Sequence, residues 1–200
     1  MPKVLSQDEI TAFRERLCDV AEAKFAAHGP DGVTLRELAE AMGVSPMTPY
    51  RYFKDKDAIL AAVRGRAFAR FSEAMEAAES SAARKKGAFT GSGYVNWALK
   101  NPAAYRLMFD TQQPTAQQYP ELVGAMARSR ETMTSYWRRI KADGRFKGDV
   151  ELAGHMMWAA MHGAVMLELA GLLQGGMDAR KLAARAMLSL ARDLGVVTAE

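Results

Sequence analysis

In the stretch VSPMTPYRYFKDKD, residues 44–57, two prolines stand directly before a run of aromatic and basic residues. Ser45 is a good N-cap, and Pro46 then takes the first helical position, where its missing N–H costs nothing. Pro49 comes about one turn later, where a proline removes a regular backbone hydrogen bond and crowds the Ser45 carbonyl. The stretch therefore predicts a short helix from Pro46 to about Phe53, with a distorted first turn.

The residues before this stretch predict another short helix. In TLRELAEAMG, Thr34 and Glu37 form a capping box, and Gly43 suits a left-handed exit from the helix. An amphipathic helix over Asp8–Ala27 precedes it, and Asp55 is the N-cap of a long helix that follows the opening stretch. Two short helices joined by a tight turn form a helix-turn-helix motif, which places its second helix in the major groove of DNA.

An excess of basic charge begins at the end of this motif and continues into the helix that follows it. Residues 1–50 hold five Lys and Arg against eight Asp and Glu, whereas residues 51–70 hold six against two, in a chain of 200 residues with net charge +4. Lysine, arginine and tyrosine at such a motif contact phosphates, which fix the register on DNA and make binding depend on salt. The sequence therefore predicts double-stranded DNA as a partner.

Two parts of the chain resemble a known family. TLRELAEAMGVSPMTPYRYFKDKDAIL, residues 34–60, resembles the DNA-binding domain of TetR/AcrR-type transcriptional regulators in its capped helix, its A-x-x-x-G-V-S turn and its YRYF run. Further along, NPAAYRLMF and WAAMHGAVMLELAG are similar to the ligand-binding domain of a TetR subgroup with a Trp…His-Gly signature, here Trp158, His162 and Gly163. The resemblance implies a homodimeric repressor that binds a palindromic operator and leaves it when a small-molecule effector binds.

The resemblance also implies roles for single residues. The expected DNA-binding residues lie on or beside the two helices of the motif: Arg36, Ser45, Pro46, Met47, Thr48, Tyr50, Arg51, Tyr52 and Lys56. A guanine suits Arg36 or Arg51 bidentately, and thymine methyl groups suit Pro46 or Met47. Tyr50 and Tyr52 lie two positions apart on a helix and cannot share a face, so at least one of them should point to solvent or DNA.

The remainder of the chain also predicts helices. Apolar periodicity returns over five segments: Tyr94–Leu99, Ala103–Phe109, Leu122–Ile140, Val150–Leu172 and Leu182–Leu194. The segment SSAARKKGAFTGSG, residues 80–93, is a composition break at which one helix ends and another restarts weakly. We expect an all-α chain of about nine helices, divided into a helix-turn-helix domain at 1–54, a connecting helix at 55–80 and an effector-binding and dimerisation domain at 81–200.

The second half is rich in methionine and tryptophan, which suit a pocket for a largely apolar ligand but also an ordinary core. The pocket candidates are Trp97, Met108, Met126, Met133, Trp137, Trp158, Met161 and His162. The segment Val150–Leu172 is apolar almost all round and must be buried on several sides. The resemblance implies that the last two helices form the dimer interface. Glu168, the lone acid of that tract, suits either an interface arginine or a cationic effector.

Several classes of function find no support in the sequence. His155 and His162 lie seven apart, whereas zinc-binding pairs on a helix are usually four apart, so we expect no metal and no cofactor. No nucleophile elbow, P-loop or dinucleotide fingerprint indicates an enzyme. A single buried Cys18, no targeting signal and no long apolar segment predict a cytoplasmic protein. The rival prediction is a DNA-binding adaptor whose second half contacts proteins rather than a ligand.

Overall fold

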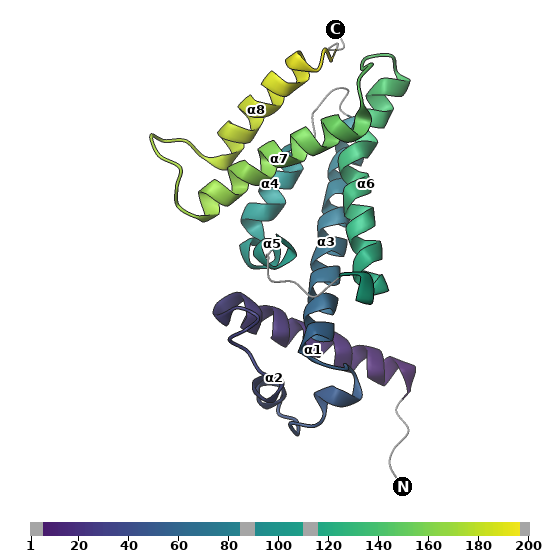
Figure 1. The fold of residues 1–200 in the computed structure, drawn as a ribbon, viewed down its shortest axis with the longest axis vertical. Helices are drawn as coiled ribbons and strands as arrows, with labels where there is room; N and C mark the ends of the chain where they lie inside the picture. Colours follow the sequence, from purple (N-terminus) through teal and green to yellow (C-terminus); the bar gives the residue numbers. More distant parts are fainter. Residues whose placement is uncertain (1–5, 85–90, 110–115, 197–200) are drawn as a thin grey trace. The chain divides into compact units, whose positions relative to one another are not determined.

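The structure is a computed structural model that describes residues 6–84, 91–109 and 116–196. In these residues it has eight α-helices, two short 3₁₀ helices and no strand (Figure 1), which confirms the all-α prediction; about nine helices were expected. The elements are α1 (Gln7–His28), α2 (Leu35–Ala41), η1 (Pro49–Arg51), α3 (Lys56–Arg84), α4 (Gly91–Lys100), α5 (Pro102–Phe109), η2 (Ala116–Gln118), α6 (Pro120–Ala142), α7 (Val150–Leu169) and α8 (Ala179–Asp193).

The chain forms two compact units. The first contains Met1–Phe68 and Ala103–Ala125, and the second contains Ala69–Pro102 and Met126–Glu200. Helices α3 and α6 contribute residues to both units. The expected functional division at residues 54 and 80 stays a prediction, and residues 85–90 of the expected composition break lie outside the described residues.

The first unit is built around one face of α1. Its hydrophobic core is made by residues of α1, α2, α3, α5 and the connecting segments: Phe13, Leu17, Cys18, Ala21, Phe25, Val33, Leu38, Phe53, Ile59, Leu60, Val63 and Leu107. Cys18 is buried as predicted, and this burial raises the pKa of its thiol. The core anchors both ends of the exposed turn of the helix-turn-helix segment. Leu38 precedes this turn, Phe53 follows it, and both side chains are buried in the core.

Local capping sets the bounds of α2. The hydroxyl of Thr34 accepts a hydrogen bond from the Glu37 amide at 3.2 Å, and the Glu37 carboxylate accepts one from the Thr34 amide at 2.7 Å. These bonds from the Thr34 amide and hydroxyl lower the pKa of Glu37. Gly43 follows with φ 67°, a left-handed conformation that a glycine adopts at little cost. The predicted capping box and helix exit are confirmed.

The predicted helix from Pro46 to about Phe53 is wrong in its extent. Only Pro49–Arg51 are helical, as the 3₁₀ helix η1, and the preceding residues form a turn in which the Thr48 amide donates to the Ser45 carbonyl at 2.8 Å. Pro49 is therefore the first residue of η1, where its missing N–H breaks no bond. Its own carbonyl accepts from the amides of Tyr52 and Phe53, both at 3.0 Å. The two prolines divide the stretch into two tight turns instead of distorting one helix.

The second unit packs α7 and α8 as a helical hairpin, with α4 against both of them (Figure 1). Residues of α3 and α6 in this unit lie side by side, joined by hydrogen bonds from Arg128 to Glu76 at 2.6 and 2.8 Å. Helix α7 ends three residues before the predicted Leu172, because Gly171 has φ 68° and the Leu172 amide bonds back to the Leu167 carbonyl at 2.9 Å. This left-handed glycine closes the helix in a Schellman arrangement.

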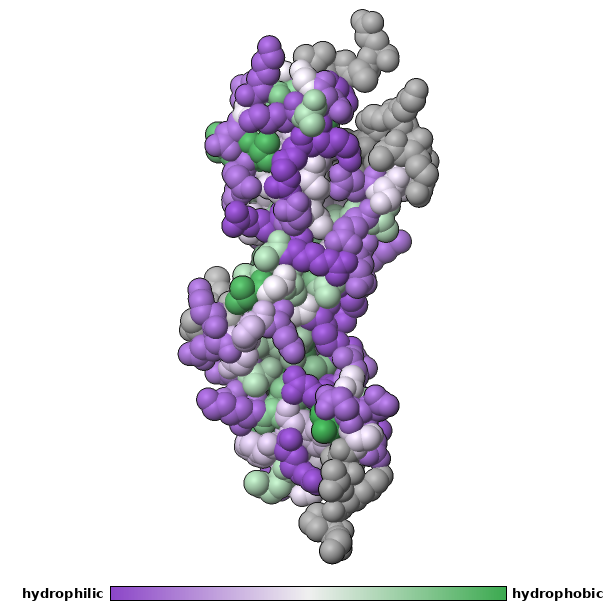
Figure 2. All heavy atoms as spheres, turned by 90° about the vertical axis from the view of Figure 1, so that its right-hand side faces the viewer, coloured by the Kyte–Doolittle hydropathy of each residue, from purple (hydrophilic) through white to green (hydrophobic). Residues whose placement is uncertain are grey.

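Hydrophilic residues cover most of the face seen in Figure 2, with smaller hydrophobic areas between them. Among the described residues, no helix combines the length and the apolar character that crossing a membrane requires.

Candidate functional site

The helix-turn-helix segment exposes most of the side chains that the sequence assigns to DNA. Six of them are exposed: Arg36, Ser45, Pro46, Met47, Tyr50 and Arg51. The other three are half-buried: Thr48, Tyr52 and Lys56. Met47 is 68% exposed and Tyr50 is 50% exposed, which is unusual for side chains of this size in a small domain. A rigid turn that presents an unburied methionine and tyrosine is suited to contact with another molecule.

The two exposed arginines of the motif make no polar contact among the described residues. Neither the Arg36 nor the Arg51 guanidinium has a hydrogen-bond or ion-pair partner among the described residues, in contrast to Arg14, Arg64 and Arg66 of the same unit. An arginine fork without an internal acceptor is available for bidentate contact with an anion or a base edge.

Tyr52 and Phe53 face inward, unlike Tyr50. The Tyr52 ring stacks on Phe13 of α1 with centroids 4.0 Å apart and planes at 18°. Phe53 is 4% exposed and belongs to the core. Of the two tyrosines, Tyr50 is therefore the one directed to solvent.

Arg14 of helix α1 contacts the end of the turn at Pro49–Arg51, here called the recognition turn. Its Nη1 donates to the Tyr52 carbonyl at 2.7 Å, and its guanidinium lies 4.2 Å from the centroid of the Phe53 ring. A single 3₁₀ turn cannot stabilise itself as a longer helix does. We infer that Phe13 and Arg14 fix the position of Pro49–Arg51.

Lys56 is also engaged inside the unit. Its Nζ donates to the Pro30 carbonyl at 2.8 Å, which ties the loop after α1 to the start of α3. Beside it, Asp55 caps α3 as predicted by accepting from the Ala58 amide at 2.8 Å. To contact a phosphate, the Lys56 ammonium group must therefore either keep its hydrogen bond to the Pro30 carbonyl and donate a second one, or break that bond.

The sequence reasoning missed Phe13 and Arg14. One signal was present, because Arg14 lies three and four residues before Leu17 and Cys18 and so stands on the apolar face of α1. A charged residue on the buried side of an amphipathic helix indicates a specific partner, although it does not identify that partner.

Replacing Arg14 with methionine is expected to lower the affinity for a specific DNA site by about tenfold, since hydrogen bonds to charged groups contribute about 1.5–3 kcal/mol. The turn at Pro49–Arg51 then loses its hold on α1 while the core stays filled. Binding of specific and random duplexes, measured with the purified chain, checks this. The control is Arg16→Met, because Arg16 is exposed and lies 5.8 Å from the Phe13 ring centroid. An unchanged ratio of specific to random affinity in Arg14→Met contradicts the inferred role.

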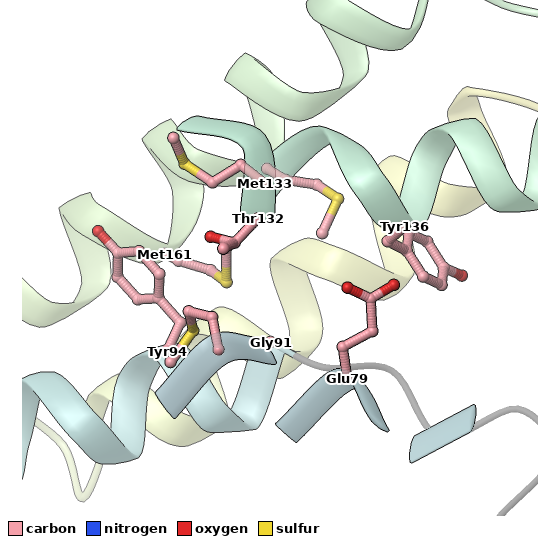
Figure 3. Close-up of a pocket in the computed structure, with 9 residues that line it drawn as sticks. Glu79, Gly91, Tyr94, Thr132, Met133, Tyr136 and Met161 are labelled. Carbon is pink, nitrogen blue, oxygen red and sulfur yellow. The ribbon is translucent and has the colours of Figure 1, made fainter. Parts of the chain in front are cut away.

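The second unit contains a small pocket of about 30 Å³, here called the methionine pocket (Figure 3). Its apolar walls come from four methionines and two tyrosines: Met75, Met133, Met157, Met161, Tyr94 and Tyr136. Glu79, Gly91 and Thr132 complete the lining. Burial raises the pKa of the Tyr136 hydroxyl above its usual range.

The structure distributes the predicted pocket residues over several places. Met133 and Met161 line the methionine pocket, and the Trp158 indole donates to the hydroxyl of the lining residue Tyr94 at 3.0 Å. His162 lies 6.1 Å from Trp158 between ring centroids, and its burial lowers its pKa.

The other predicted pocket residues lie elsewhere. Trp97 packs edge-on against Phe71. Trp137 is buried beside Phe146, and its indole N–H has no hydrogen-bond partner in the described residues. Met108 is buried in the first unit, and Met126 is exposed. A role for these four in ligand binding stays a prediction.

Polar groups meet at one side of the pocket. The Glu79 carboxylate, on α3, pairs with the Arg139 guanidinium and accepts from the Ser135 hydroxyl at 2.8 Å, both on α6. The sequence did not indicate Glu79, because its neighbours in the chain show no motif. It enters the site only through the packing of α3 against α6.

Three of the Glu and His residues of α7 make polar contacts within the second unit. The Glu151 carboxylate pairs with Arg130 at 3.3 Å, and His155 Nδ1 lies 2.7 Å from the Glu151 carbonyl. Glu168 accepts from the Ala179 amide and so helps to cap α8. Within the described residues, no three His, Cys, Asp or Glu side chains are grouped as metal ligands.

Two family models match the chain. Residues 17–63 match the bacterial regulatory proteins of the tetR family, and residues 88–190, just over half of the chain, match the tetracyclin repressor-like C-terminal domain. The first match contains the whole helix-turn-helix segment described above, and the second contains the pocket residues of α4, α6 and α7.

The chain is also similar to two transcriptional regulators and to one solved structure. The chain is 41% identical over 63 residues to the HTH-type transcriptional repressor Rv1474c of Mycobacterium tuberculosis, a match to 32% of this chain and about a third (33%) of that relative. It is 20% identical over 196 residues to the regulator Rv1816 of the same species, covering 82% and 84% of the two chains. A solved structure of a Rhodococcus sp. RHA1 protein of unknown function superimposes with TM-score 0.78 at 25% identity, covering 98% of this chain and 99% of that one.

Proposed function

The chain belongs to the TetR family of bacterial regulatory proteins, and on this premise we propose that it is a repressor that a small-molecule effector releases from a palindromic operator. Proteins of this family bind DNA as dimers, so its role as a DNA-binding transcriptional regulator follows from membership. The operator, the effector step and the dimer geometry are parts of the proposal.

The exposed turn of the helix-turn-helix segment carries the proposal for DNA. Met47 and Tyr50 are exposed, and the guanidinium groups of Arg36 and Arg51 lack partners among the described residues. In this arrangement the arginines read guanine edges, and Pro46 and Met47 contact thymine methyl groups in the major groove. Ser45, Thr48, Tyr50 and, after rearrangement, Tyr52 and Lys56 contact phosphates.

The exposed face of α7 supports a homodimer through α7 and α8. Apolar and small residues that are exposed or half-buried recur there at helical spacing: Leu152, Met156, Ala159, Gly163, Met166 and Leu167. Leu152 on α7 is 57% exposed and Leu188 on α8 is 56% exposed. Among the described residues, a Cβ on Gly163 would meet nothing within 4 Å, so no neighbouring side chain or backbone that the structure describes requires a glycine there. Close approach of a partner helix gives it a use.

The methionine pocket is the proposed effector site. Its thioethers and tyrosine rings suit an apolar body, and methionine side chains adapt their rotamers to different occupants. Effector binding among α3, α6 and α7 changes how α3 is held, and α3 continues into the residues of the DNA-binding unit.

One observation favours a second function, a ligand-independent DNA-binding adaptor. The methionine pocket has about 30 Å³, room for about two waters, whereas drug-sized ligands occupy about 300–1,000 Å³. If a broad library of apolar compounds leaves operator affinity unchanged, the adaptor replaces the effector-released repressor.

Selection of bound duplexes from a random DNA pool at moderate salt, followed by sequencing, tests the DNA part of the proposal. We expect enrichment of a palindrome with two half-sites about one helical turn apart, because a symmetric dimer presents two equivalent recognition turns. Salt-dependent binding without an enriched sequence overturns the operator, since it means that the basic segment contacts only the DNA backbone.

A further inference from the structure

The methionine pocket holds one carboxylate among its described lining residues, that of Glu79. This side chain is largely buried, with 22% of its surface exposed. Figure 3 shows Glu79 extending from α3 with its carboxylate toward the α6 side of the pocket, where Met133 and Tyr136 lie. A carboxylate in a mostly apolar wall is unfavourable unless a cation or hydrogen-bond donors compensate its charge.

The compensating cation is Arg139. Its guanidinium pairs with Glu79 and also lies 5.5 Å from the centroid of the Tyr136 ring. Carboxylate and aromatic face together form a binding position for a positive group, and the structure shows that position filled by a side chain of the protein itself. The Arg139 side chain is 39% exposed, so it can turn to water without leaving a buried charge behind.

We propose that the methionine pocket binds an amphipathic monocation, an ammonium or guanidinium group on a compact apolar body, whose charged group replaces Arg139 beside Glu79. This inference rests on the proposed function, in which the same pocket receives the effector. The apolar body lies among the methionine thioethers, and the charged group lies between the Glu79 carboxylate and the Tyr136 ring.

The charge balance favours a cation over other ligands of the same shape. Exchange of one cation for another keeps Glu79 neutralised, and the released Arg139 regains its hydration. An anion instead faces Glu79 at short range, which is repulsive in a site with little water. A neutral ligand leaves the pair in place and gains only its apolar contacts.

The pocket must widen to accept such a body, because its volume is about 30 Å³. Four of the lining residues are methionines, whose unbranched side chains change rotamer with little strain. A compact ligand of one ring and a short chain therefore suits the site better than a large one.

Replacement of Arg139 by a ligand also changes the contacts between α3 and α6. Glu79 lies on α3, whereas Ser135 and Arg139 lie on α6, so these contacts join the two helices inside the second unit. A ligand that takes the place of Arg139 breaks the ion pair and leaves α3 held by fewer groups. Ligand charge is thereby coupled to the helix that continues into the DNA-binding unit.

Calorimetry on the full chain without DNA, at pH 7, tests the proposal with three matched probes: 2-phenylethylammonium, 2-phenylethanol and 3-phenylpropanoate. The ammonium should bind about tenfold tighter than the alcohol, and the carboxylate more weakly than either. Arg139→Gln should tighten ammonium binding about tenfold, because Glu79 is then free of its internal cation. Glu79→Gln should abolish the preference for the ammonium.

Arg138→Gln is the matched control, since Arg138 is the neighbouring arginine on α6, is 44% exposed and pairs with Glu131 outside the pocket lining. It should leave all three affinities unchanged. If Glu79→Gln does not fold, Arg139→Gln alone decides the matter. Absence of ammonium binding, equal or tighter binding of the alcohol or carboxylate, or weaker ammonium binding by Arg139→Gln overturns the proposal.

Operator titrations with the same probes separate this inference from the proposed function. Release by the alcohol or carboxylate but not by the ammonium supports an effector-released repressor and overturns the cation. Ammonium binding that leaves operator affinity unchanged supports the cation site and removes the effector step from the proposed function.

Discussion

Replacing Arg51 with alanine is expected to lower the affinity for the selected operator by about 30- to 25,000-fold. A bidentate arginine–guanine contact contributes about 1–3 kcal/mol of discrimination, and a dimer loses it twice, for a total of about 2–6 kcal/mol. Arg51 is exposed and has no partner among the described residues, so its removal leaves the fold intact. Titration of operator and random duplexes, with thermal unfolding of the variant, measures both effects.

Lys54→Ala is the control for Arg51→Ala. Lys54 is exposed, carries the same charge and lies three residues further along the chain. We expect it to weaken operator and random DNA about equally and to reduce the salt dependence of binding, as loss of a phosphate contact does. Equal losses on operator and random DNA for Arg51→Ala itself would show that Arg51 contacts the backbone and does not read a base.

Replacing Gly163 with leucine is expected to dissociate the dimer and to lower operator affinity by about 100- to 10,000-fold, the range by which linking two binding modules raises affinity. A Cβ at position 163 meets nothing within 4 Å among the described residues, and a glycine inside a helix costs about 1 kcal/mol relative to alanine. The protomer should therefore be at least as stable as before. Only the close approach of a partner helix is blocked. Sedimentation across a concentration series, followed by operator titration, checks this.

Gly124→Leu is the matched control. Gly124 lies in α6, and a Cβ there likewise meets nothing within 4 Å in the part of the chain that the structure describes. The same substitution should leave both the oligomeric state and the operator affinity unchanged. A Gly163→Leu variant that remains dimeric and binds the operator normally contradicts an interface through this face of α7.

Much of the helix-turn-helix segment could be predicted from the sequence because its determinants are local. The capping box of Thr34 and Glu37, the left-handed Gly43 and the cap at Asp55 each depend on residues within one helical turn. The extent of the helix after Pro46 was the exception. The Ser45 cap with Pro46 at the first helical position favoured a helix of about two turns, whereas Pro49 begins a single 3₁₀ turn and is itself buried.

The methionine pocket could be predicted only in its composition. Methionines and tryptophans in the second half indicated an apolar, adaptable site, and Met133 and Met161 do line the methionine pocket. Helical periodicity shows which residues share a face of one helix, but it does not show which face of another helix they meet. Trp97 and Trp137 therefore looked equivalent to the lining residues and yet pack against Phe71 and Phe146.

The sequence by itself determined the all-α class, the helix-turn-helix motif and its caps, because periodicity, capping and proline chemistry act between near neighbours in the chain. The tertiary structure alone decided that Arg14 holds a recognition turn 38 residues away and that Glu79 meets Arg139 60 residues away. Such pairs form only when helices pack, and packing is selected by the shape and burial of whole faces. One side chain then enters a functional site through partners that its own stretch of sequence does not specify.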